Sequence, residues 1–567
     1  MASRIKPAGW LIIAAIIAGL TWFGITRLSS KTGGGVASVF SKDDMAQKGA
    51  EAPDANGVTT KKEYSYVAAA RLPEVKGTSN YKPMTDRTVR MAVNVWAGWA
   101  PLFYANGGAK AGKVWKDATG QPFKLQITLI DDPVAMRDAY AAGDVHIGWA
   151  TLDMVPLLVE SLRKDSRTMP RIFQQVDFSN GGDGIVVRSK VKTVADLRGK
   201  TCVLAQNSPS QYFLLNTLLD GGVQPSEVTF KYTQDAFQAA AAFNADKSID
   251  CVASWSPDIY NLEKVAGNRI LVTTQTANKL IADVWFARAD FAKDNPAIIE
   301  GISRGVFDAM ESLKDAAAKA QVAKYMADAY SIPATDATSM LGDAHWTNFA
   351  ENKAFFLDAS NPSNFERVWQ NANFIYKRLG AITTATPFDQ VMDFSVVQKL
   401  SKEAKYAASK DEYQTTFVPT NASTVQAESN EILTKTVVIQ FFPNSDSIDK
   451  VVTLPDGRKQ PYDPNAPNVV EEIGRLAGQY GNARIVIEGH TDGSMRGQID
   501  PSAVKELSLR RANAVKQSLT RKFKSLQPNQ FVTNGLGWDR PADATDPTNH
   551  AKNRRVEVKV YPLEAVK

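Results

Sequence analysis

The chain has 567 residues, and at roughly 150 residues per domain this length predicts about four compact units. Hydrophobic residues make up 44% of the chain and charged residues 22%, the balance of a globular protein with a full core. This composition excludes a disordered, collagen-like or coiled-coil chain and a multi-span membrane protein. The net charge is only +6 and no basic patch is interleaved with aromatic residues, so we expect no nucleic-acid partner.

Two cysteines and four histidines supply few groups for metal or redox chemistry. Cys202 and Cys251 are too far apart in sequence for a CxxC motif, and no HExxH pair occurs. We therefore expect no metal, no cofactor and no enzymatic activity. Both cysteines lie early in predicted strands, where an oxidised pair and two buried free thiols remain equally open.

The first segment of the chain is predicted to be a membrane anchor. Residues 7–26 carry no charge and are flanked by Lys6 and Arg27. A helix of this length spans roughly 30 Å, the thickness of a bilayer core. Trp10 and Trp22 lie near its ends, where aromatic rings favour the membrane interface. A cleaved signal peptide is the alternative, but the apolar run is long for one and no A-x-A-like site follows it.

By the positive-inside rule, the basic residues before this span place the N-terminus in the cytoplasm. We therefore expect residues 1–26 to form a cytoplasmic stub and one transmembrane helix, with the bulk of the chain on the other side of the membrane. Two polar stretches, 27–85 and 402–430, are predicted as linkers. They leave two folded regions, 86–401 and 431–567.

In the region 86–401, short apolar strands alternate with helical patterns in two successive series. The first series has predicted strands 89–95, 125–130 and 145–149, with helices that open at 96–101 and 132–133 and a helix over 154–162. The second series has predicted strands 184–187, 201–205, 228–232, 250–255 and 284–288, with helices over 208–219 and 237–244. These units predict right-handed crossovers and parallel sheets. Two such lobes would hold a ligand in the cleft at the carboxyl ends of their strands.

Three segments of this region carry a family resemblance: NGGDGIVVRS, VKTVADLRGKTCVLAQNSPSQYFLL and KSIDCVASWSPD. In this order and spacing they resemble the periplasmic solute-binding proteins of the nitrate/sulfonate/taurine type, over about residues 86–385. The resemblance implies a two-lobed receptor of an ABC importer that closes over a small molecule.

One candidate solute site is the turn that leads into the predicted helix 208–219. Ser208 and Gln211 fit an S-x-x-Q capping box, and Ser210 lies in the same turn. In a two-lobed fold, free N–H groups at this turn would face the cleft and attract an oxyanion. A simple helix cap explains the same residues, and the two interpretations are about equally supported.

Tryptophans form the second candidate solute site. Trp96, Trp99, Trp149 and Trp255 fall at or just after the ends of predicted strands. Core packing is the default for any one of them, but four at such ends favour stacking walls or a cage for a cationic ammonium group. Asp258 is a further candidate in the cleft. An oxyanion-binding turn and an aromatic cage imply different ligands, and the sequence does not choose between them.

The C-terminal region carries the most specific motifs. Strands are predicted over 436–442 and 484–488 and helices over 468–479 and 507–515. GHTD, LSLRRA and NRRVEV follow in this order, and together they resemble the OmpA-like peptidoglycan-binding domain over about residues 431–567.

Members of that family grip diaminopimelate, a zwitterion of the peptidoglycan stem peptide. The resemblance implies that Asp492 meets its ammonium group and that Arg511 grips its carboxylate. Thr491, Leu507 and Ser508 come from the same motifs and are expected at the site. The alternative is a simple Asp–Arg salt bridge, which contributes little at a surface.

Two departures from the family and one histidine qualify this prediction. Val504 stands where the family usually has asparagine, and the loop between Asp492 and Leu507 is longer than usual. His490 lies beside Asp492, but no nucleophile or metal partner accompanies it. Peptidoglycan hydrolysis is therefore only a weak third hypothesis.

The predicted fold class is α/β: a two-lobed periplasmic-binding-protein fold followed by an OmpA-C-like α/β sandwich, with one N-terminal transmembrane helix. We expect a single-pass inner-membrane protein of a Gram-negative bacterium that binds an anionic or zwitterionic solute for transport or sensing and holds peptidoglycan. An ABC permease or another envelope complex would be its partner. The rival hypothesis is an envelope tether or scaffold whose two lobes bind other proteins.

Overall fold

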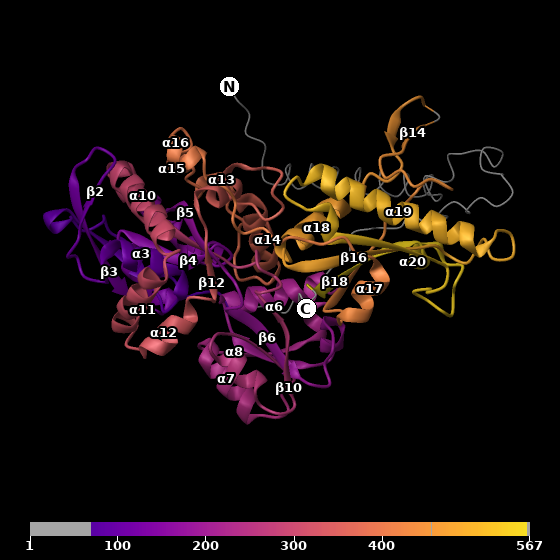
Figure 1. The fold of residues 1–567 in the computed structure, drawn as a ribbon, viewed down its shortest axis with the longest axis horizontal. Coiled ribbons are helices and arrows are strands. Elements are labelled where there is room, and N and C mark those ends of the chain that lie inside the picture. Colours follow the sequence, from indigo (N-terminus) through magenta and orange to yellow (C-terminus); the bar gives the residue numbers. More distant parts are fainter. Residues whose placement is uncertain (1–69, 455, 564–567) are drawn as a thin grey trace, which may run out of the picture.

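The computed structural model of the chain describes residues 70–454 and 456–563. The predicted span 7–26 and most of the predicted linker 27–85 lie outside the described residues. Within the described ranges, no helix combines the length and the apolar character that a membrane crossing needs. Figure 1 shows two α/β lobes and a C-terminal domain beside them.

Lobe 1 is built on a seven-stranded sheet in the order β12-β5-β11-β4-β1-β3-β2. Its strands are β1 (Thr88–Val93), β2 (Val114–Lys116), β3 (Pro122–Leu129), β4 (Ile147–Thr151), β5 (Pro170–Ser179), β11 (Ala282–Arg288) and β12 (Ala344–Trp346). Every residue of β4 and β11 is buried, as expected for strands covered on both faces. This sheet carries the largest hydrophobic core.

Helices cover both faces of the lobe 1 sheet, and one of them begins as the sequence predicts. The Asp132 carboxylate caps α4 by accepting a hydrogen bond from the Ala135 N–H at 2.6 Å, with Pro133 in the first turn. The helices are α3 (Ala100–Asn106), α4 (Pro133–Ala141), α5 (Val155–Leu162), α9 (Ala289–Asp294), α10 (Pro296–Ser312), α11 (Ala316–Tyr330), α12 (Ala334–Met340), α13 (Phe349–Leu357), α14 (Phe365–Arg378) and α15 (Ser395–Leu400).

Lobe 2 is a smaller unit with a five-stranded sheet in the order β10-β6-β9-β7-β8. Its elements are β6 (Asp183–Arg188), β7 (Thr201–Ala205), α6 (Pro209–Asp220), β8 (Thr229–Thr233), α7 (Ala236–Ala245), β9 (Cys251–Trp255), α8 (Asp258–Glu263) and β10 (Asn268–Thr273). Cys202 and Cys251 face each other between β7 and β9, and both are buried free thiols.

The prediction of parallel sheets is correct only in part. β1 runs parallel to β3 and β4, and β7 runs parallel to β8 and β9. In lobe 1, however, β11 is antiparallel to β4 and β5, and in lobe 2 β6 is antiparallel to β9 and β10. The chain crosses between the lobes at 179–183 and again at 273–282. The strands next to these crossings run antiparallel to strands of the βαβ units.

Residues 70–84, here called the strap, lie along lobe 1. The Ser79 and Lys82 N–H groups donate to the carbonyls of Ala141 and Gly143, at 3.1 and 3.0 Å. A Cβ atom at Gly143, where φ is +75°, would lie 2.4 Å from the Asn80 carbonyl oxygen. Only glycine therefore allows the strap to approach this closely.

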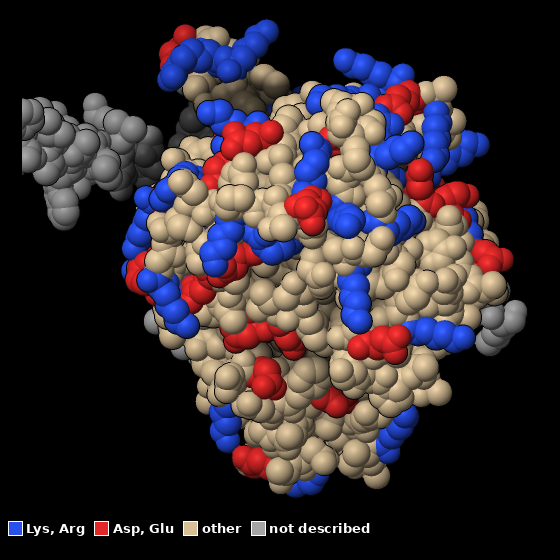
Figure 2. Space-filling model, turned by 90° about the vertical axis from the view of Figure 1, so that its left-hand side faces the viewer, with Lys and Arg blue, Asp and Glu red and all other residues tan. Residues whose placement is uncertain are grey.

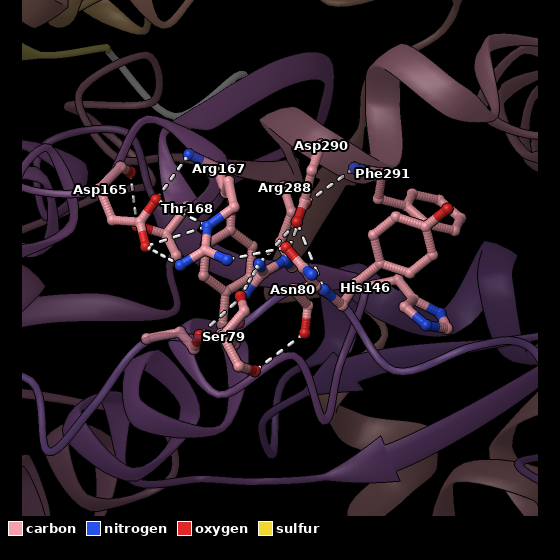
Figure 3. A network of polar contacts seen from close by, with 12 residues as sticks. Ser79, Asn80, His146, Asp165, Arg167, Thr168, Arg288, Asp290 and Phe291 are labelled. Atoms are coloured by element: carbon pink, nitrogen blue, oxygen red, sulfur yellow. Dashed lines mark hydrogen bonds and ion pairs between the residues drawn. The ribbon is translucent and has the colours of Figure 1, made fainter.

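A buried arginine fastens the strap to the lobe (Figure 3). Arg288 is fully buried and donates to the Ser79 carbonyl at 2.6 Å and to both oxygens of Asp290, at 3.0 and 2.8 Å. On the other side of the strap, Arg167 donates to the Asn80 side chain at 2.7 Å. Because several donors and acceptors are satisfied together, this end of the predicted linker is part of the folded lobe.

The C-terminal domain has a four-stranded sheet in the order β13-β18-β16-β17, with helices against it (Figure 1). Its elements are α17 (Ala422–Glu428), β13 (Leu433–Val437), β14 (Val451–Thr453), β15 (Lys459–Pro461), α18 (Ala466–Gln479), β16 (Ala483–His490), α19 (Pro501–Lys522), β17 (Phe531–Gly537), α20 (His550–Asn553) and β18 (Arg555–Pro562). The first strand lies a few residues earlier than the predicted 436–442.

The C-terminal domain packs directly on lobe 2 and α14, and one hydrophobic core runs through all three. At its polar edge, Asp220 of α6 forms ion pairs with Arg475, at 3.3 Å, and Lys435, at 3.5 Å. The Asn216 amide donates to the Gln479 side chain at 3.2 Å. The predicted linker 402–430 contains α16 (Ala404–Ala407) and α17, and it buries Phe417 and Val425.

Candidate functional site

A narrow pocket lies in the C-terminal domain beside the end of β16. Five basic or imidazole side chains line it, and they come from three separate segments: His490, Arg511, His550, Arg554 and Arg555. Its other walls are residues 438–441, Gly489 and Val556. Such a concentration of guanidinium groups suits a ligand that carries a carboxylate.

Asp492 lies directly behind this pocket and is fully buried. Its carboxylate contacts the Arg554 guanidinium and lies 2.9 Å from His550 Nδ1. It also accepts a hydrogen bond from the Ser494 N–H at 2.6 Å. Burial alone would raise the pKa of Asp492, but His550, Arg554 and Ser494 hold it well below its usual range. The carboxylate is therefore ionised, with Arg554 and His550 as its ion partners.

Arg511 lies in the pocket wall, on the face of α19 that is turned toward the sheet. Its Nε donates to the Ser445 carbonyl at 3.1 Å, and its guanidinium lies 4.8 Å from the centre of the Phe441 ring. Among the described residues, Arg554 and His550 are the ion partners of Asp492, whereas the sequence left open a simple salt bridge to Arg511.

The other residues of the predicted wall site hold its backbone in place. The Thr491 N–H donates to the Gly537 carbonyl at 2.8 Å, and the Gly537 N–H donates to the Ser508 hydroxyl at 3.0 Å. A Cβ atom at Gly489 would lie 2.1 Å from the Ser508 carbonyl oxygen, so α19 packs on β16 at close range. Leu507 is buried in the same contact region.

Val504, the departure from the family pattern, is an apolar packing residue. It is buried against Met495 and Trp538. The long loop after Asp492 therefore has a small core of its own, which ties the loop to the start of α19.

His490 belongs to a trio, with Glu488 and Glu557, whose ligand atoms all lie within 4.8 Å of one another. Lys559 already lies 3.1 Å from Glu488, and Arg555 lies 2.7 Å from Glu557. Burial lowers the pKa of His490 to about 4, with the Arg555 charge adding to the effect. These carboxylates thus have protein cations as partners, and the trio is best explained as an ion-pair network.

In lobe 2, the predicted oxyanion turn uses much of its own hydrogen-bonding capacity. The Ser208 hydroxyl accepts the Gln211 N–H at 3.4 Å and donates to the Ala205 carbonyl at 2.8 Å. The Gln211 side chain accepts the Asn207 N–H at 2.6 Å rather than that of Ser208. The capping box is thus shifted by one residue. Ser210 is fully buried, and its hydroxyl has no partner among the described residues.

Trp255 and Asp258 lie at the carboxyl end of β9 and the start of α8. Trp255 meets Phe237 edge to face, at 5.8 Å between ring centres. Burial raises the pKa of Asp258 above its usual value. In the described chain, neither Ser208 nor Trp255 has a hydrogen bond or ring contact with the tryptophans of lobe 1.

The lobe 1 tryptophans are at a strand end only in part, because Trp96 and Trp99 follow β1 whereas Trp149 is the middle residue of β4. Trp96 donates from its indole N–H to the Asp177 carboxylate at 3.3 Å. Trp99 is fully buried, stacks on Trp285 at 5.6 Å and donates to Asn94 at 2.7 Å. Trp149 donates to the Ile130 carbonyl at 3.0 Å.

Sequence reasoning missed a group of buried acids beside these tryptophans: Asp153, Asp177, Asp183 and Asp283. A signal was present in the two strands that were missed or shortened. Residues 172–178 read IFQQVDF and residues 282–286 read ADVWF. Polar residues inside otherwise apolar strands are the pattern of a buried polar site rather than of a core.

Comparison with known proteins supports two families in two parts of the chain. Residues 172–319 match the family described as NMT1/THI5 like, and residues 459–555 match the OmpA family. The chain is thus similar to each family over one segment. Both resemblances predicted from the motifs are therefore confirmed.

Curated relatives match over the same two parts. Outer membrane protein Omp38 of Acinetobacter baumannii is 37% identical over 100 residues, which are 17% of this chain and 25% of that protein. The putative aliphatic sulfonates-binding protein of Escherichia coli is 25% identical over 170 residues, which are 30% of this chain and 50% of that protein. The matches thus span a quarter to a half of the relatives' own length.

Among solved structures, the periplasmic aliphatic sulphonate binding protein SsuA from Escherichia coli aligns with a TM-score of 0.41 at 17% identity, over 59% of this chain and 98% of that one. The periplasmic sulfonate-binding protein from Methylobacillus flagellatus KT aligns with a TM-score of 0.45 at 18% identity, over 58% of this chain and 100% of that one.

Proposed function

We propose that this protein is a periplasmic receptor that binds a small solute between its two lobes and holds peptidoglycan with its C-terminal domain. The two family segments support the two halves of this proposal. The observation that carries it furthest is the placement of Asp492 directly behind a pocket walled by Arg511 and two further arginines.

The chemistry of this pocket suits the zwitterionic end of a diaminopimelate side chain. The carboxylate of such a ligand would meet the guanidinium of Arg511 in the pocket wall, because guanidinium groups pair strongly with carboxylates. Its ammonium group would reach Asp492 by taking the place of the imidazole of His550. Thr491, Leu507 and Ser508 contribute by fixing the strand end and the helix that carry the two charged groups.

Cosedimentation of the full-length protein with purified sacculi tests the wall-binding proposal. Arg511→Ala should lower the bound fraction at least tenfold because the ligand carboxylate loses its guanidinium partner. Arg510→Ala is the matched control, since Arg510 is a half-exposed neighbour that pairs with Glu506 and Asp446. Equal binding by wild type and Arg511→Ala would contradict the assignment.

The Asp492 arm of the same experiment uses Asp492→Asn, which keeps the shape of the side chain and removes its charge. Binding to sacculi should fall as it does for Arg511→Ala. Asp500→Asn is the control, because Asp500 caps α19 and asparagine caps a helix equally well. Release of muropeptides from the sacculi by the wild-type protein would instead favour a hydrolase.

The receptor half of the proposal rests on a solute at the cleft between the lobes. We expect native mass spectrometry of the full-length protein, purified without denaturation, to show a small molecule of defined mass in the complex. An empty protein that also ignores sulfonates, phosphates, carboxylates and betaines would favour the rival function, a scaffold whose lobes bind other proteins.

The proposed receptor needs partners to act, since transport or signalling requires a pore or an enzyme that this chain is not expected to supply. An ABC permease or another envelope complex would fill that role. The predicted span 7–26 would anchor the receptor as a single-pass inner-membrane protein. Extraction of membranes with carbonate checks this, because an anchored chain stays in the pellet and a cleaved one is released.

A further inference from the structure

The sheet of lobe 1 brings acidic side chains together next to the hinge between the lobes. Asp177 of β5 and Asp283 of β11 are directly opposite each other, and Thr151 of β4 is opposite Asp283 on the other side. Side chains that are opposite in register project from the same face of a sheet. These three polar groups therefore form one row, just before the chain crosses into lobe 2.

Two more carboxylates extend this row at its ends. Asp153 follows β4, and Asp183 begins β6 immediately after the first crossing. All four aspartates are at most 5% exposed. Throughout residues 70–454 and 456–563, no Lys or Arg forms an ion pair with any of them, in contrast to Asp492 and Asp220 in other parts of the molecule.

A second row on the same face consists of uncharged groups. Trp285 of β11 is opposite Trp149 on one side and Gln174 on the other. Trp285 is fully buried and Gln174 is 1% exposed, yet the indole N–H and both polar atoms of the amide have no partner in the described chain. Buried polar groups are almost always hydrogen-bonded in native proteins, so these groups are candidates for contact with a polar ligand.

The turn that follows β1 covers both rows. Trp99 stacks on Trp285, and the indole N–H of Trp96 points at Asp177. A Cβ atom at Gly98 would lie 1.7 Å from an Asp177 oxygen, so the turn lies directly on the carboxylate. Trp96 also lies against Gly182 in the crossing segment. The aromatic rings and the carboxylates thus lie next to one another at the hinge.

We propose that the solute of the two-lobed domain carries a positively charged nitrogen, an ammonium or quaternary ammonium group, held between these four carboxylates and the indole rings of Trp96, Trp99 and Trp285. This inference rests on the proposed receptor function and specifies its ligand. Carboxylates supply the opposite charge, and the faces of indole rings attract organic cations. A buried charge without a partner is costly, and a bound cation removes that cost.

The titration behaviour of these groups agrees with this assignment. Burial raises the pKa of Asp153 to about 7 and that of Asp183 to about 6. Burial and the neighbouring Asp177 raise the pKa of Asp283 well above its usual value. Without a cation the cluster holds protons instead, which is the expected response of like charges that cannot all ionise together.

Other ligand classes fit this site less well. An anionic head group such as a sulfonate would face four carboxylates and no basic side chain. A single metal ion needs ligand atoms that converge, and in the described chain the trio that meets this distance is Glu488, His490 and Glu557, in the C-terminal domain. An organic cation is larger than a metal ion and its charge is more diffuse. Carboxylates that are spread apart and aromatic side chains therefore suit it better.

Titration of the dialysed full-length protein in detergent, followed by tryptophan fluorescence and calorimetry, tests the proposal. The probes are choline and putrescine as cations, ethanesulfonate and nitrate as anions, and calcium chloride. We expect saturable binding of at least one organic cation and none of the anions. Binding of an anion alone, or of calcium alone, would overturn the ligand class and leave the receptor function standing.

Variants locate the site. Asp283→Asn and Asp177→Asn should each weaken binding of the cation at least tenfold, while Asp315→Asn, a helix-cap carboxylate of lobe 1, should not. Cation binding that survives both hinge substitutions would overturn the location. If either variant fails to fold, the wild-type comparison of cations with anions still decides the class. No binding of any probe, together with no co-purified molecule, would reject both this inference and the receptor function.

Discussion

Burial shifts the pKa of individual side chains in this protein, upward for some groups and downward for others. The raised pKa of Asp153, about 7, means that the folded protein holds a proton that the unfolded chain releases near pH 4. His146 shows the reverse, because burial lowers its pKa to about 4 and keeps it neutral where the unfolded chain would be charged. Lowering the pH therefore raises the free energy of unfolding through Asp153 and lowers it through His146.

Replacing Asp153 with asparagine should separate these two contributions. Between about pH 4 and pH 7 the folded wild type binds more protons than the unfolded chain, so its free energy of unfolding falls as the pH rises, by about 1.4 kcal/mol per pH unit for this group. Asp153→Asn lacks this fall, and the contribution of His146 is common to both proteins. Urea denaturation at pH 5 and pH 7 measures the difference, which we expect to be about 2 to 3 kcal/mol. Identical pH dependence in both proteins would show that Asp153 titrates normally.

The sequence motifs name two residues that lie at or beside the pocket of the C-terminal domain: Arg511 lines it, and Asp492 contacts His550 and Arg554, which line it. GHTD and LSLRRA predict Asp492 and Arg511 because the residues of each motif are adjacent in sequence. Their positions relative to one another are therefore set by local structure. The partners His550 and Arg554 were not predicted, since they come from a segment about 60 residues later in the chain. Trp99 and Ser208 turn out to have packing and capping contacts, which strand-end position alone does not distinguish from ligand contacts.

At the scale of elements, local signals decide what the sequence can predict. The cap at Asp132 and the strand Thr201–Ala205 are as predicted, because caps and apolar runs depend on neighbours in sequence. The strands β5, β10 and β11 depend on the two crossings between the lobes, and such long-range pairing has no local signature. α19 runs over 22 residues rather than the nine predicted, because its polar first turns carry no apolar pattern.

The strap gives a prediction at this scale. Arg288→Ala removes a fully buried guanidinium, so the Ser79 carbonyl loses this donor and Asp290 loses its ion partner while it keeps the N–H groups of Tyr81 and Phe291. Breaking a buried pair in this way costs about 3 to 5 kcal/mol. Arg167→Ala is the control: its side chain is 41% exposed, and we expect a loss of at most about 1 kcal/mol. Chemical denaturation measures both, and a small loss for Arg288→Ala would mean that the strap is dispensable.

At the scale of the whole molecule, Lys and Arg are interspersed with Asp and Glu on the lobe 1 end rather than gathered in one basic patch (Figure 2).

Lobe 2 and the C-terminal domain share one hydrophobic core. A domain joined only by flexible linkers would have a core of its own. These parts should therefore unfold together.

Gly478 of α18 tests this shared interface. A Cβ atom there would lie 2.6 Å from Pro362 Cγ and 2.7 Å from Ser363 Oγ. Gly478→Leu should therefore force the C-terminal domain away from lobes 1 and 2 and make the segment 402–430 accessible to protease. Gly112→Leu is the control, because Gly112 is exposed and a Cβ atom there would meet no described atom within 4 Å. Unchanged proteolysis of Gly478→Leu would show that the interface adapts without opening.

The shared core also limits which parts of the proposed receptor can move. On the proposed attachment to the wall, the C-terminal domain would be held, and lobe 2 and helix α14 of lobe 1 would be held with it, so closure over a solute would move mainly the part of lobe 1 that lies away from α14. The helices α10, α11 and α12 at the far end of lobe 1 (Figure 1) then sweep the widest arc. Binding of a solute would thus change the position of these helices relative to the wall. A neighbouring membrane protein in contact with them would detect that movement.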